Sequence, residues 1–531
     1  MTLATHFVAR SGAARRPAAP GRNFVVACLC LAIAAPAHAT LFWGPEANLS
    51  GSPSNTETGL NHHPMARTAD GALHVVWAEQ DAPNLNFRIT TRRLLHGTWT
   101  PSEVIVDYLA TDPGSTGGAK YPALAALPDG SLDLFWHDYR VAGIANVELF
   151  TKTRPPGGPW EPARTADVRL TTTNHPETNG DNSYVPVPVA ADDGATHVVW
   201  FDYRYDGQFA EILSKSRPAS GTWDLTPGDS ADVRLTDDPE NSELPDADVD
   251  AAGHVHAVWR SGSAGATVGY ARRDAGTATW SAPVTVDLGA AVAGAPAVAV
   301  DDTGNVHVVW PDSRDGGKAL WTRVRSPAGT WGAELRLTTP GHGADEPSLD
   351  CGPDGALHLV WHDGRVSLLA PQVFHRALTA GAAWDTTGTA DTRVSLGSSP
   401  AVRPSVLADG DQVFVTWQDD RDGNPELYFR AAGPLGTDVP GLLPSPAAGT
   451  SGTLTAAPNP AATPVRFART DGLPLGFLEV WDIGGRRVRR IASAAGTAAW
   501  DLRRDDGTRA APGVYFVRAA ATDTRRVTVL R

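Results

Sequence analysis

An aspartate and an arginine two residues apart recur five times in this sequence, always at the same distance after a tryptophan. A guanidinium can hold a carboxylate through two parallel hydrogen bonds, so three such arginines could grip the carboxylate of a substrate. A motif repeated five times is more typical of a structural contact between neighbouring units, because an active site needs different groups at different places. We therefore predict a structural role for five pairs: Asp138 and Arg140, Asp202 and Arg204, Asp312 and Arg314, Asp363 and Arg365, and Asp419 and Arg421.

A row of histidines invites a metal-binding interpretation. Five of them, each three residues before a tryptophan, are His74, His197, His256, His307 and His358. Ligands must approach a zinc ion to about 2 Å, whereas equivalent strands of stacked sheets lie about 10 Å apart. We therefore expect buried, hydrogen-bonded histidines, and the sequence predicts no metal site and no cofactor.

The most varied polar residues stand directly before seven prolines. These segments read NHHP, AKYP, SYVP, SELP, GAP, DEP and VRP. Because a ligand site needs different groups at different places, we predict that these segments surround one; the alternative is a solvated rim. The candidate ligand-binding residues are His62, His63, Lys120, Tyr121, Tyr184, Glu243, Asp345, Glu346 and Arg403.

The spacing of tryptophans and prolines indicates the structural elements that position these side chains. These residues mark a sequence repeat that occurs seven times. The tryptophans are Trp77, Trp136, Trp200, Trp259, Trp310, Trp361 and Trp417. A proline precedes each at a nearly constant distance: Pro64, Pro122, Pro186, Pro245, Pro296, Pro347 and Pro404. Recurrence of this kind is typical of repeat architectures.

Each unit contains four β-rich runs. A first run such as PAVAV and a second such as VHVVW are joined by a Gly/Asp turn, which is typical of a hairpin. A third run, such as ALWTRVR, follows a polar loop, and a fourth begins at a second tryptophan. Four antiparallel strands make a propeller blade, so the sequence predicts an all-β chain with a seven-bladed β-propeller.

The seventh unit ends after its third run, and the segment that completes it stands at the other end of the propeller. The motif FWGPEANLS at 42–50 aligns with the fourth-strand motif TWGAELRLT at 330–338. We predict that this N-terminal strand is the missing fourth strand of the last blade, which closes the ring and removes its free edges.

The turns SPAGTW and SRPASGTW resemble Asp-boxes that lack the usual aspartate. On these turns and the repeat, residues 41–432 resemble the sialidase-like, BNR-type repeats of bacterial exported proteins. The resemblance implies a propeller. The sequence departs from family sialidases in lacking the Arg-Ile-Pro motif that begins their arginine triad, and in having seven units where sialidases usually have six, so sialidase activity does not follow.

A Pro/Gly/Ser linker at 433–452 separates this region from a tail at 453–531, which consists of alternating runs bounded by Gly, Pro or Asp. Such runs predict a small β-sandwich. The motifs PNP, VWDIGGRRV, WDLRRDDG and PGVYFVR resemble the C-terminal sorting domain of type IX secretion, an Ig-like module. The resemblance implies that secretion machinery is a partner and that the protein is secreted or attached to the outer-membrane surface.

The N-terminus fits export as well. Four arginines precede the apolar run NFVVACLCLAIAAPA, which predicts a signal peptide at 1–39, cut before Thr40. The mature chain at 40–531 then keeps one cysteine, Cys351, and no later run is apolar enough to span a bilayer. The formal net charge of −14, concentrated in the propeller region, argues against nucleic acid as a partner.

These features predict an exported recognition protein that binds a glycan or a protein ligand through its propeller. Motifs for nucleophilic, zinc or phosphate chemistry are absent, so no catalytic residue is assigned. Two alternatives stay open. One is a sialidase-type glycoside hydrolase, because glycosidase carboxylates leave no short motif; the other is a structural surface-display protein.

Overall fold

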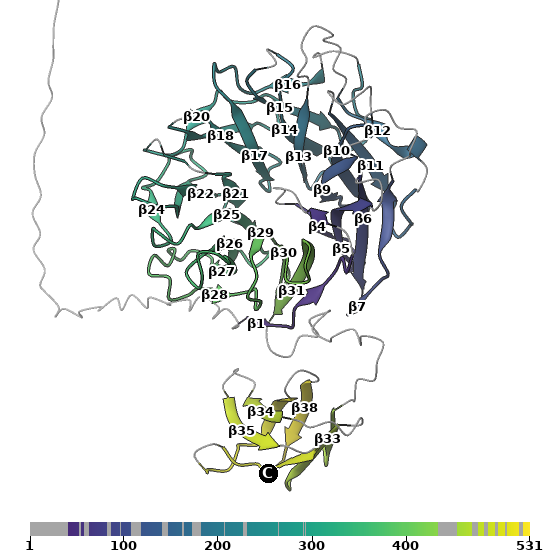
Figure 1. Cartoon of the computed structure of the whole chain (residues 1–531), viewed down its shortest axis with the longest axis vertical. Coiled ribbons are helices and arrows are strands. Elements are labelled where there is room, and N and C mark those ends of the chain that lie inside the picture. Colours follow the sequence, from purple (N-terminus) through teal and green to yellow (C-terminus); the bar gives the residue numbers. More distant parts are fainter. Residues whose placement is uncertain are drawn as a thin grey trace, which may run out of the picture. The chain divides into compact units, whose positions relative to one another are not determined.

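The computed structural model of this chain describes residues 41–52, 55–57, 63–81, 86–95, 97–107, 118–140, 147–161, 164–171, 182–205, 208–226, 231–263, 265–289, 291–292, 294–433, 454–469, 476–482, 487–493, 497–504, 507–519 and 524–530. Nearly all of these residues lie in strands, turns and loops (Figure 1). No helix among them is long and apolar enough to cross a membrane. The predicted signal peptide, the linker beyond Gly433 and the candidate residue His62 lie outside the described residues.

Strands between residues 42 and 433 form seven antiparallel sheets, numbered here in chain order. In sheets 2 to 6 each strand pairs with the next one along the chain. Sheet 2 contains β9 (Ala119–Ala126), β10 (Leu132–Asp138), β11 (Glu148–Arg154) and β12 (Val168–Arg169). Sheet 3 contains β13 (Ser183–Ala190), β14 (Thr196–Asp202), β15 (Glu211–Arg217) and β16 (Val233–Arg234). Sheet 4 contains β17 (Ser242–Val249), β18 (Val255–Ser261), β19 (Thr267–Arg273) and β20 (Val284–Thr285).

Sheets 5 and 6 follow the same four-strand plan, whereas sheets 1 and 7 contain six and five strands. Sheet 5 contains β21 (Ala297–Val300), β22 (Val306–Asp312), β23 (Ala319–Arg325) and β24 (Leu335–Arg336). Sheet 6 contains β25 (Asp345–Cys351), β26 (Leu357–Asp363), β27 (Gln372–Leu378) and β28 (Thr392–Arg393). Sheet 1 contains β3 (Thr56–Glu57), β4 (Met65–Arg67), β5 (Leu73–Asp81), β6 (Asn86–Leu95), β7 (Thr98–Trp99) and β8 (Glu103–Val106). Sheet 7 contains β1 (Phe42–Trp43), β2 (Ala47–Asn48), β29 (Ala401–Asp409), β30 (Gln412–Asp419) and β31 (Glu426–Gly433).

Both faces of each sheet are apolar, because side chains alternate across a strand and every sheet has a neighbour on each side. In sheet 4, Trp259 packs in a cluster shared with sheet 3, whereas the adjacent Val258 packs in one shared with sheet 5. All seven repeat tryptophans are fully buried in this way. Burial of such large side chains on both faces supplies the main stabilisation of the repeat.

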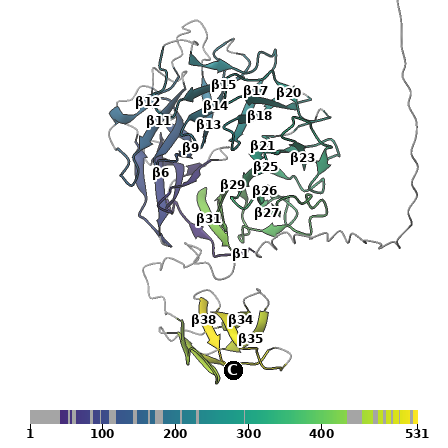
Figure 2. The same ribbon diagram turned by 180° about the vertical axis from the view of Figure 1, so that it is seen from behind.

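Seven hydrophobic clusters join consecutive sheets, and the last of them joins sheet 7 back to sheet 1. In that closing cluster, Val75 and Trp77 of β5 pack with Phe414 of β30 and Phe429 of β31. Strands β9, β13, β17, β21, β25 and β29 lie nearest the centre of this part of the chain (Figures 1 and 2). Four-stranded sheets that follow one another around a centre are consistent with a β-propeller.

The N-terminal strands complete sheet 7, as the sequence alignment predicted. Phe42 and Trp43 pair with Gly433 and Ala432 of β31, and β2 pairs with the same strand further along. The side chain of Arg430 also donates a hydrogen bond of 2.6 Å to the carbonyl of Gly44. The outer edge of β31 is therefore covered by the start of the described chain.

A bulge at the recurring proline shapes the central strand in five sheets. In sheet 4, Glu243 faces Arg260 and Asp246 faces Val258, so Leu244 and Pro245 together occupy one register position. Proline lacks an amide hydrogen and cannot continue the ladder there. The residue before it has a left-handed backbone with φ of 49–55°, and these residues are Tyr121, Val185, Leu244, Glu346 and Arg403. The bulge interrupts the ladder at the end of the strand where the candidate ligand residues lie.

The described residues beyond 453 form two further antiparallel sheets. One contains β32 (Leu454–Ala457), β33 (Val465–Arg469) and β36 (Thr497–Trp500). The other contains β34 (Gly476–Asp482), β35 (Arg487–Ser493), β37 (Gly513–Ala519) and β38 (Thr524–Val529). Side chains of both sheets, among them Phe467, Val480 and Trp500, share one buried cluster.

Candidate functional site

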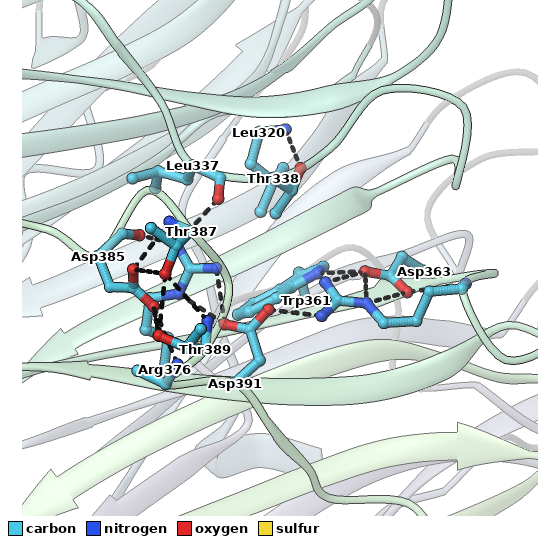
Figure 3. Close-up of polar contacts among 12 residues, drawn as sticks. Leu320, Leu337, Thr338, Trp361, Asp363, Arg376, Asp385, Thr387, Thr389 and Asp391 are labelled. Carbon is cyan, nitrogen blue, oxygen red and sulfur yellow. Dashed lines mark hydrogen bonds and ion pairs between the residues drawn. The ribbon is translucent and has the colours of Figure 1, made fainter.

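The repeated aspartate and arginine pairs are ties within a sheet. In sheet 6 the guanidinium of Arg365 donates to Asp363 at 2.5 and 2.9 Å and, through Nη1, to Asp391 at 2.5 Å. Trp361 Nε1 donates to the same Asp363 at 2.9 Å, so the aspartate anchors both the loop and the core tryptophan (Figure 3). The five arginines bind a second acid near the fourth strand of their own sheet: Asp167, Asp232, Glu334, Asp391 and Glu46.

These bonds correct one part of the prediction. A structural role is supported, because each guanidinium fork is already occupied by two protein carboxylates. The expected link between neighbouring units is wrong for the arginines themselves, which bind within one sheet. The contacts with the preceding sheet are made by second acids. Glu334 accepts a hydrogen bond from the amide of Leu288, and Glu46 accepts one from the amide of Leu396.

The tie that does join neighbouring sheets is a basic residue on the third strand, which the sequence reasoning missed. Arg376 Nη1 donates to the carbonyl of Leu337 in sheet 5 at 3.0 Å and to that of Asp385 in its own sheet at 2.5 Å (Figure 3). Six sheets have this bridge to a carbonyl of the preceding sheet, made by Arg92, Lys152, Lys215, Arg323, Arg376 and Arg430. Its signal was present in the sequence, since each basic residue stands two positions after the one that faces the repeat tryptophan.

The five predicted histidines are all buried, as expected. Four are hydrogen-bonded: His197 to Ser216, His256 to Tyr270, His307 to Asp301 and His358 to His375. His74 differs, because its buried Nε2 has no hydrogen-bond partner. Among the described residues, no group of three or more His, Cys, Asp or Glu side chains is arranged to hold a metal ion.

The predicted ligand residues separate into an aromatic group and a charged group. Tyr121 and Tyr184 lie in the aromatic group at the starts of β9 and β13, where their rings are 4.7 and 5.3 Å from that of His137. Lys120 lies beside this group with its ammonium 4.0 Å from the ring centre of Phe87. The aromatic candidates therefore cluster at one end of sheets 2 and 3.

Further residues complete a tyrosine group, defined as Tyr121, Tyr139, Tyr184 and Tyr203 around His137. All four tyrosines are half-buried, whereas His137 is 1% exposed. Both ring nitrogens of His137 lack a hydrogen-bond partner, and burial together with the charge of Lys120 lowers the pKa of His137 to about 3. Tyr139 and Tyr203 fill the middle position of the aspartate and arginine motif, a signal that the sequence reasoning did not use.

The charged candidates are paired with their neighbours. Glu243 accepts a hydrogen bond of 2.8 Å from Arg260, beside Tyr203, and burial followed by the charge of Glu243 raises the pKa of that tyrosine. On sheets 5 to 7 the pairs are Lys318 with Asp345, His362 with Glu346 at 3.1 Å, and Arg403 with Gln418 at 3.1 Å. These charged candidates are therefore held by ion pairs or hydrogen bonds to neighbouring side chains. Of these candidates, Glu243 is the one that lies next to the tyrosine group.

His63 lies apart from both groups, at the centre of the ring. Its Nε2 is 3.2 Å from Oδ1 of Asp246 in sheet 4, although the two residues are 183 positions apart. Burial disfavours the charged imidazole, but the bond to Asp246 and the charges of Asp246, Asp248 and Asp350 outweigh it, so the pKa of His63 is raised. A single ion pair therefore links sheet 1 to sheet 4 across the centre.

The axial carboxylates, Asp246, Asp248 and Asp350, were not among the candidates. They accept the backbone amides of Val298, Val300 and Ala408 from the central strand of the next sheet. Burial raises the pKa of Asp248 to about 6 and that of Asp350 to about 7. Acids inside the apolar runs PDADV and PSLDC were the available sequence signal.

No protein-family model matches the chain, and no curated protein is detectably similar to it. Solved structures are similar at low identity. The chain is similar to the polysaccharide lyase Uly1 at 12% identity, with a TM-score of 0.47 over 75% of this chain and 97% of that one. It is also similar to a mutant of the NanB sialidase from Streptococcus pneumoniae, at 9% identity with a TM-score of 0.39 over 74% and 70%. A third is the GH93 α-L-arabinofuranosidase of Fusarium graminearum, at 15% identity with a TM-score of 0.42 over 64% and 98%.

Proposed function

We propose that this chain is an exported recognition protein, in which the seven sheets are the blades of a closed β-propeller that binds a glycan. The tyrosine group is the observation that carries the proposal. Half-buried aromatic rings offer an apolar face and a polar hydroxyl at once, and convergent polar groups beside them fix the orientation of a ligand. A sugar ring presents the same combination of apolar C–H groups and hydroxyls.

Glu243 and Arg260 supply polar groups at the edge of the tyrosine group. The pair is accessible, with side chains 24% and 19% exposed, so its remaining donors and acceptors can reach a bound ligand. The rings of Tyr121 and Tyr184 pack against the imidazole of His137, whose lowered pKa keeps it uncharged at neutral pH. The group therefore combines apolar faces and hydroxyls with the ion pair of Glu243 and Arg260.

The sialidase-type alternative has less support. A grip on a substrate carboxylate needs arginines with free donors, whereas all five repeated arginines bind two carboxylates each. At the rim, Arg260 binds Glu243 and Arg403 binds Gln418. Nothing among the described residues favours glycoside cleavage over binding.

A glycan array probed with the mature protein tests the proposal, with a fluorogenic sialoside assayed alongside. We expect binding to a restricted set of glycans, at least tenfold weaker for Tyr184→Ala because a stacking ring is removed. Tyr205→Ala is the matched control, since that ring lies 4.1 Å from the Arg234 guanidinium outside the tyrosine group. Equal binding by both variants, or turnover of the sialoside, would sink the proposal.

We further propose that residues 453–531 form an Ig-like sorting domain for export. Two sheets with one shared core support this, as does the hydroxyl of Tyr515, which donates to the carbonyl of Ala511 at 2.7 Å. A tyrosine bonded to the backbone just upstream is typical of Ig-like sandwiches. Deleting the domain should leave the propeller folded but retained in the periplasm of a host with type IX secretion. Unchanged export of the truncated chain would contradict the assignment.

A further inference from the structure

A groove between sheets 1 and 2 lies at the ends of the sheets opposite the tyrosine group. Its volume is about 370 Å³, and its lining includes His74, Arg93 and Glu103 from sheet 1 and Arg154 and Trp160 from sheet 2. His74 is the second residue of β5, and Arg154 is the last residue of β11. The groove is therefore separate from the site of the proposed function.

Two buried side-chain nitrogens of this groove have no hydrogen-bond partner. Arg154 is 3% exposed and its Nη1 has no hydrogen-bond partner, and His74 is 2% exposed with an unpartnered Nε2. A buried polar group without a partner costs free energy, and a buried charge without a counter-charge costs more. Both residues line one cavity, so a single acceptor group bound there could serve both.

The positive charges in the groove are also not balanced by a carboxylate paired with them. Burial and the nearby charge of Arg93 lower the pKa of Arg154, and Asp70 and Glu103 oppose them from a distance. Burial, followed by the two arginines, lowers the pKa of His74 to about 4, so this imidazole is neutral at neutral pH. Neither arginine forms an ion pair among the described residues. The groove thus holds two guanidinium charges in a chain whose formal net charge is −14.

The next interface around the ring shows what such an arginine binds when an acceptor is built in. Between sheets 2 and 3, Asp133 occupies the strand position of His74, and Arg217 occupies that of Arg154. Their side chains form an ion pair of 2.6 Å, which the hydroxyl of Thr196 joins. In the groove between sheets 1 and 2 a histidine replaces this carboxylate, and the arginine keeps its place without one.

The groove between sheets 3 and 4 is an intermediate case. It retains a histidine, His197, and an arginine, Arg273, in a cavity of about 640 Å³. His197 Nδ1 is bonded to Ser216 at 2.8 Å, and Asp193 and Asp274 act on the Arg273 charge. The combination of an unpartnered histidine nitrogen and an unpartnered buried arginine nitrogen therefore belongs to the first groove.

We propose that the groove between sheets 1 and 2 binds a small oxyanion group, held by Arg154 and His74 where the neighbouring interface holds the carboxylate of Asp133. The oxyanion is the carboxylate or sulfate of an acidic sugar, or a free inorganic anion of the same chemistry. Arg93 adds a second positive charge at the groove, whose lining also includes Thr91, Thr100 and Ser102.

Thermal unfolding of the mature protein tests this, with sodium sulfate, sodium phosphate or glucuronate titrated against sodium chloride at constant ionic strength. A ligand that binds the native state raises Tm in a saturable way. The decisive variant is His74→Asp, which installs the carboxylate found at the next interface. We expect its Tm in chloride to equal or exceed that of the wild type, with the anion-dependent rise lost and affinity at least tenfold weaker.

The reciprocal variant Asp133→His should create a new anion-dependent rise at Arg217. Tyr184→Ala should leave the anion effect unchanged, which separates this proposal from glycan binding at the tyrosine group. Saturable binding of glucuronate with competition by sulfate assigns an acidic sugar, and binding of sulfate or phosphate without glucuronate assigns a free anion. An equal rise in wild type and His74→Asp, or no saturable rise with any of the three anions, would overturn the proposal.

Discussion

Sheet 4 and sheet 6 have the same four strands but are braced in different places. Sheet 6 has the aspartate and arginine tie at Asp363 and Arg365 and the third-strand bridge at Arg376. Sheet 4 has Ser261 and Ser263 at the positions of the aspartate and the arginine, and Ala271 at the bridge position, so it lacks both.

Sheet 4 keeps its braces at the centre, where sheet 6 also has one at Asp350. Asp246 and Asp248 accept two amides from sheet 5, and Asp246 also meets His63 of sheet 1. On the third strand, Gly269 lies directly against Trp259, where a Cβ would come within 2.3 Å of the tryptophan ring. The outer polar ties of this repeat can therefore be absent while the central braces and the buried tryptophan remain.

Removing the N-terminal strands should have the largest effect, because sheet 7 is assembled from both ends of the propeller region. Deletion of residues 40–50 exposes the edge of β31 and removes Glu46, the second acid of Arg421. We expect aggregation or a large fall in Tm, whereas a cut within the linker at 434–452 should cause neither. Cooperative unfolding with an unchanged Tm would show that the ring closes in another way.

Arg376→Ala should be the most damaging single substitution among the ties. The side chain is fully buried, and its loss leaves Asp391 and two carbonyls short of a donor. Removing one partner of a buried pair costs about 3–5 kcal/mol, to be measured by urea unfolding. Arg272→Ala in sheet 4 is the control, because that arginine is partly exposed and pairs only with Asp274. Similar losses for both variants would mean that the third-strand bridge adds nothing to packing.

The central braces should be sensitive to pH. Because the folded state holds the proton of Asp350 more tightly than the unfolded chain does, the carboxyl stabilises the fold most below its ordinary pKa. That contribution is lost as the pH rises through about 7. Relative to Asp350→Asn, the wild type should lose up to a few kcal/mol of unfolding free energy between pH 4.5 and pH 7.5. An equal difference between the two proteins at both pH values would contradict a buried, protonated Asp350.

The aspartate and arginine tie gives the smallest expected effect. Arg314→Ala in sheet 5 should cost about 1–3 kcal/mol, because the guanidinium is shielded between Asp312 and Glu334. Arg260→Ala, at the rim of sheet 4, should cost about 1 kcal/mol or less, as exposed pairs do. Equal losses would mean that the shielded tie in sheet 5 stabilises the fold no more than the exposed rim pair in sheet 4.

Much of the fold was predictable because its signals are local and repeated. The alignment of FWGPEANLS with TWGAELRLT predicted the pairing of β1 with β31. It also sets Glu46 against Glu334, and both glutamates bind the arginine tie of their sheet. Periodicity in the sequence carries such information directly, since equivalent residues have equivalent neighbours.

The site was less predictable, because its contacts join residues far apart in the chain. Nothing local in NHHP or PDADV reveals that His63 meets Asp246 across the ring. Likewise, Tyr121, Tyr184 and Tyr203 come from separate segments and meet only when sheets 2 and 3 pack together. The sequence predicted Tyr121 and Tyr184 as ligand residues together with the charged candidates, and did not separate the aromatic group from the paired charges.

Isothermal titration with a glycan selected on the array tests the central claim most directly, comparing wild type, Tyr184→Ala and Arg314→Ala at matched folded fractions. Recognition by the tyrosine group predicts that Tyr184→Ala weakens binding at least tenfold, while Arg314→Ala lowers Tm and leaves the Kd unchanged. Loss of binding in Arg314→Ala at an unchanged Tm, with Tyr184→Ala binding normally, would contradict recognition by the tyrosine group. It would favour a ligand carboxylate held by the repeated arginines instead.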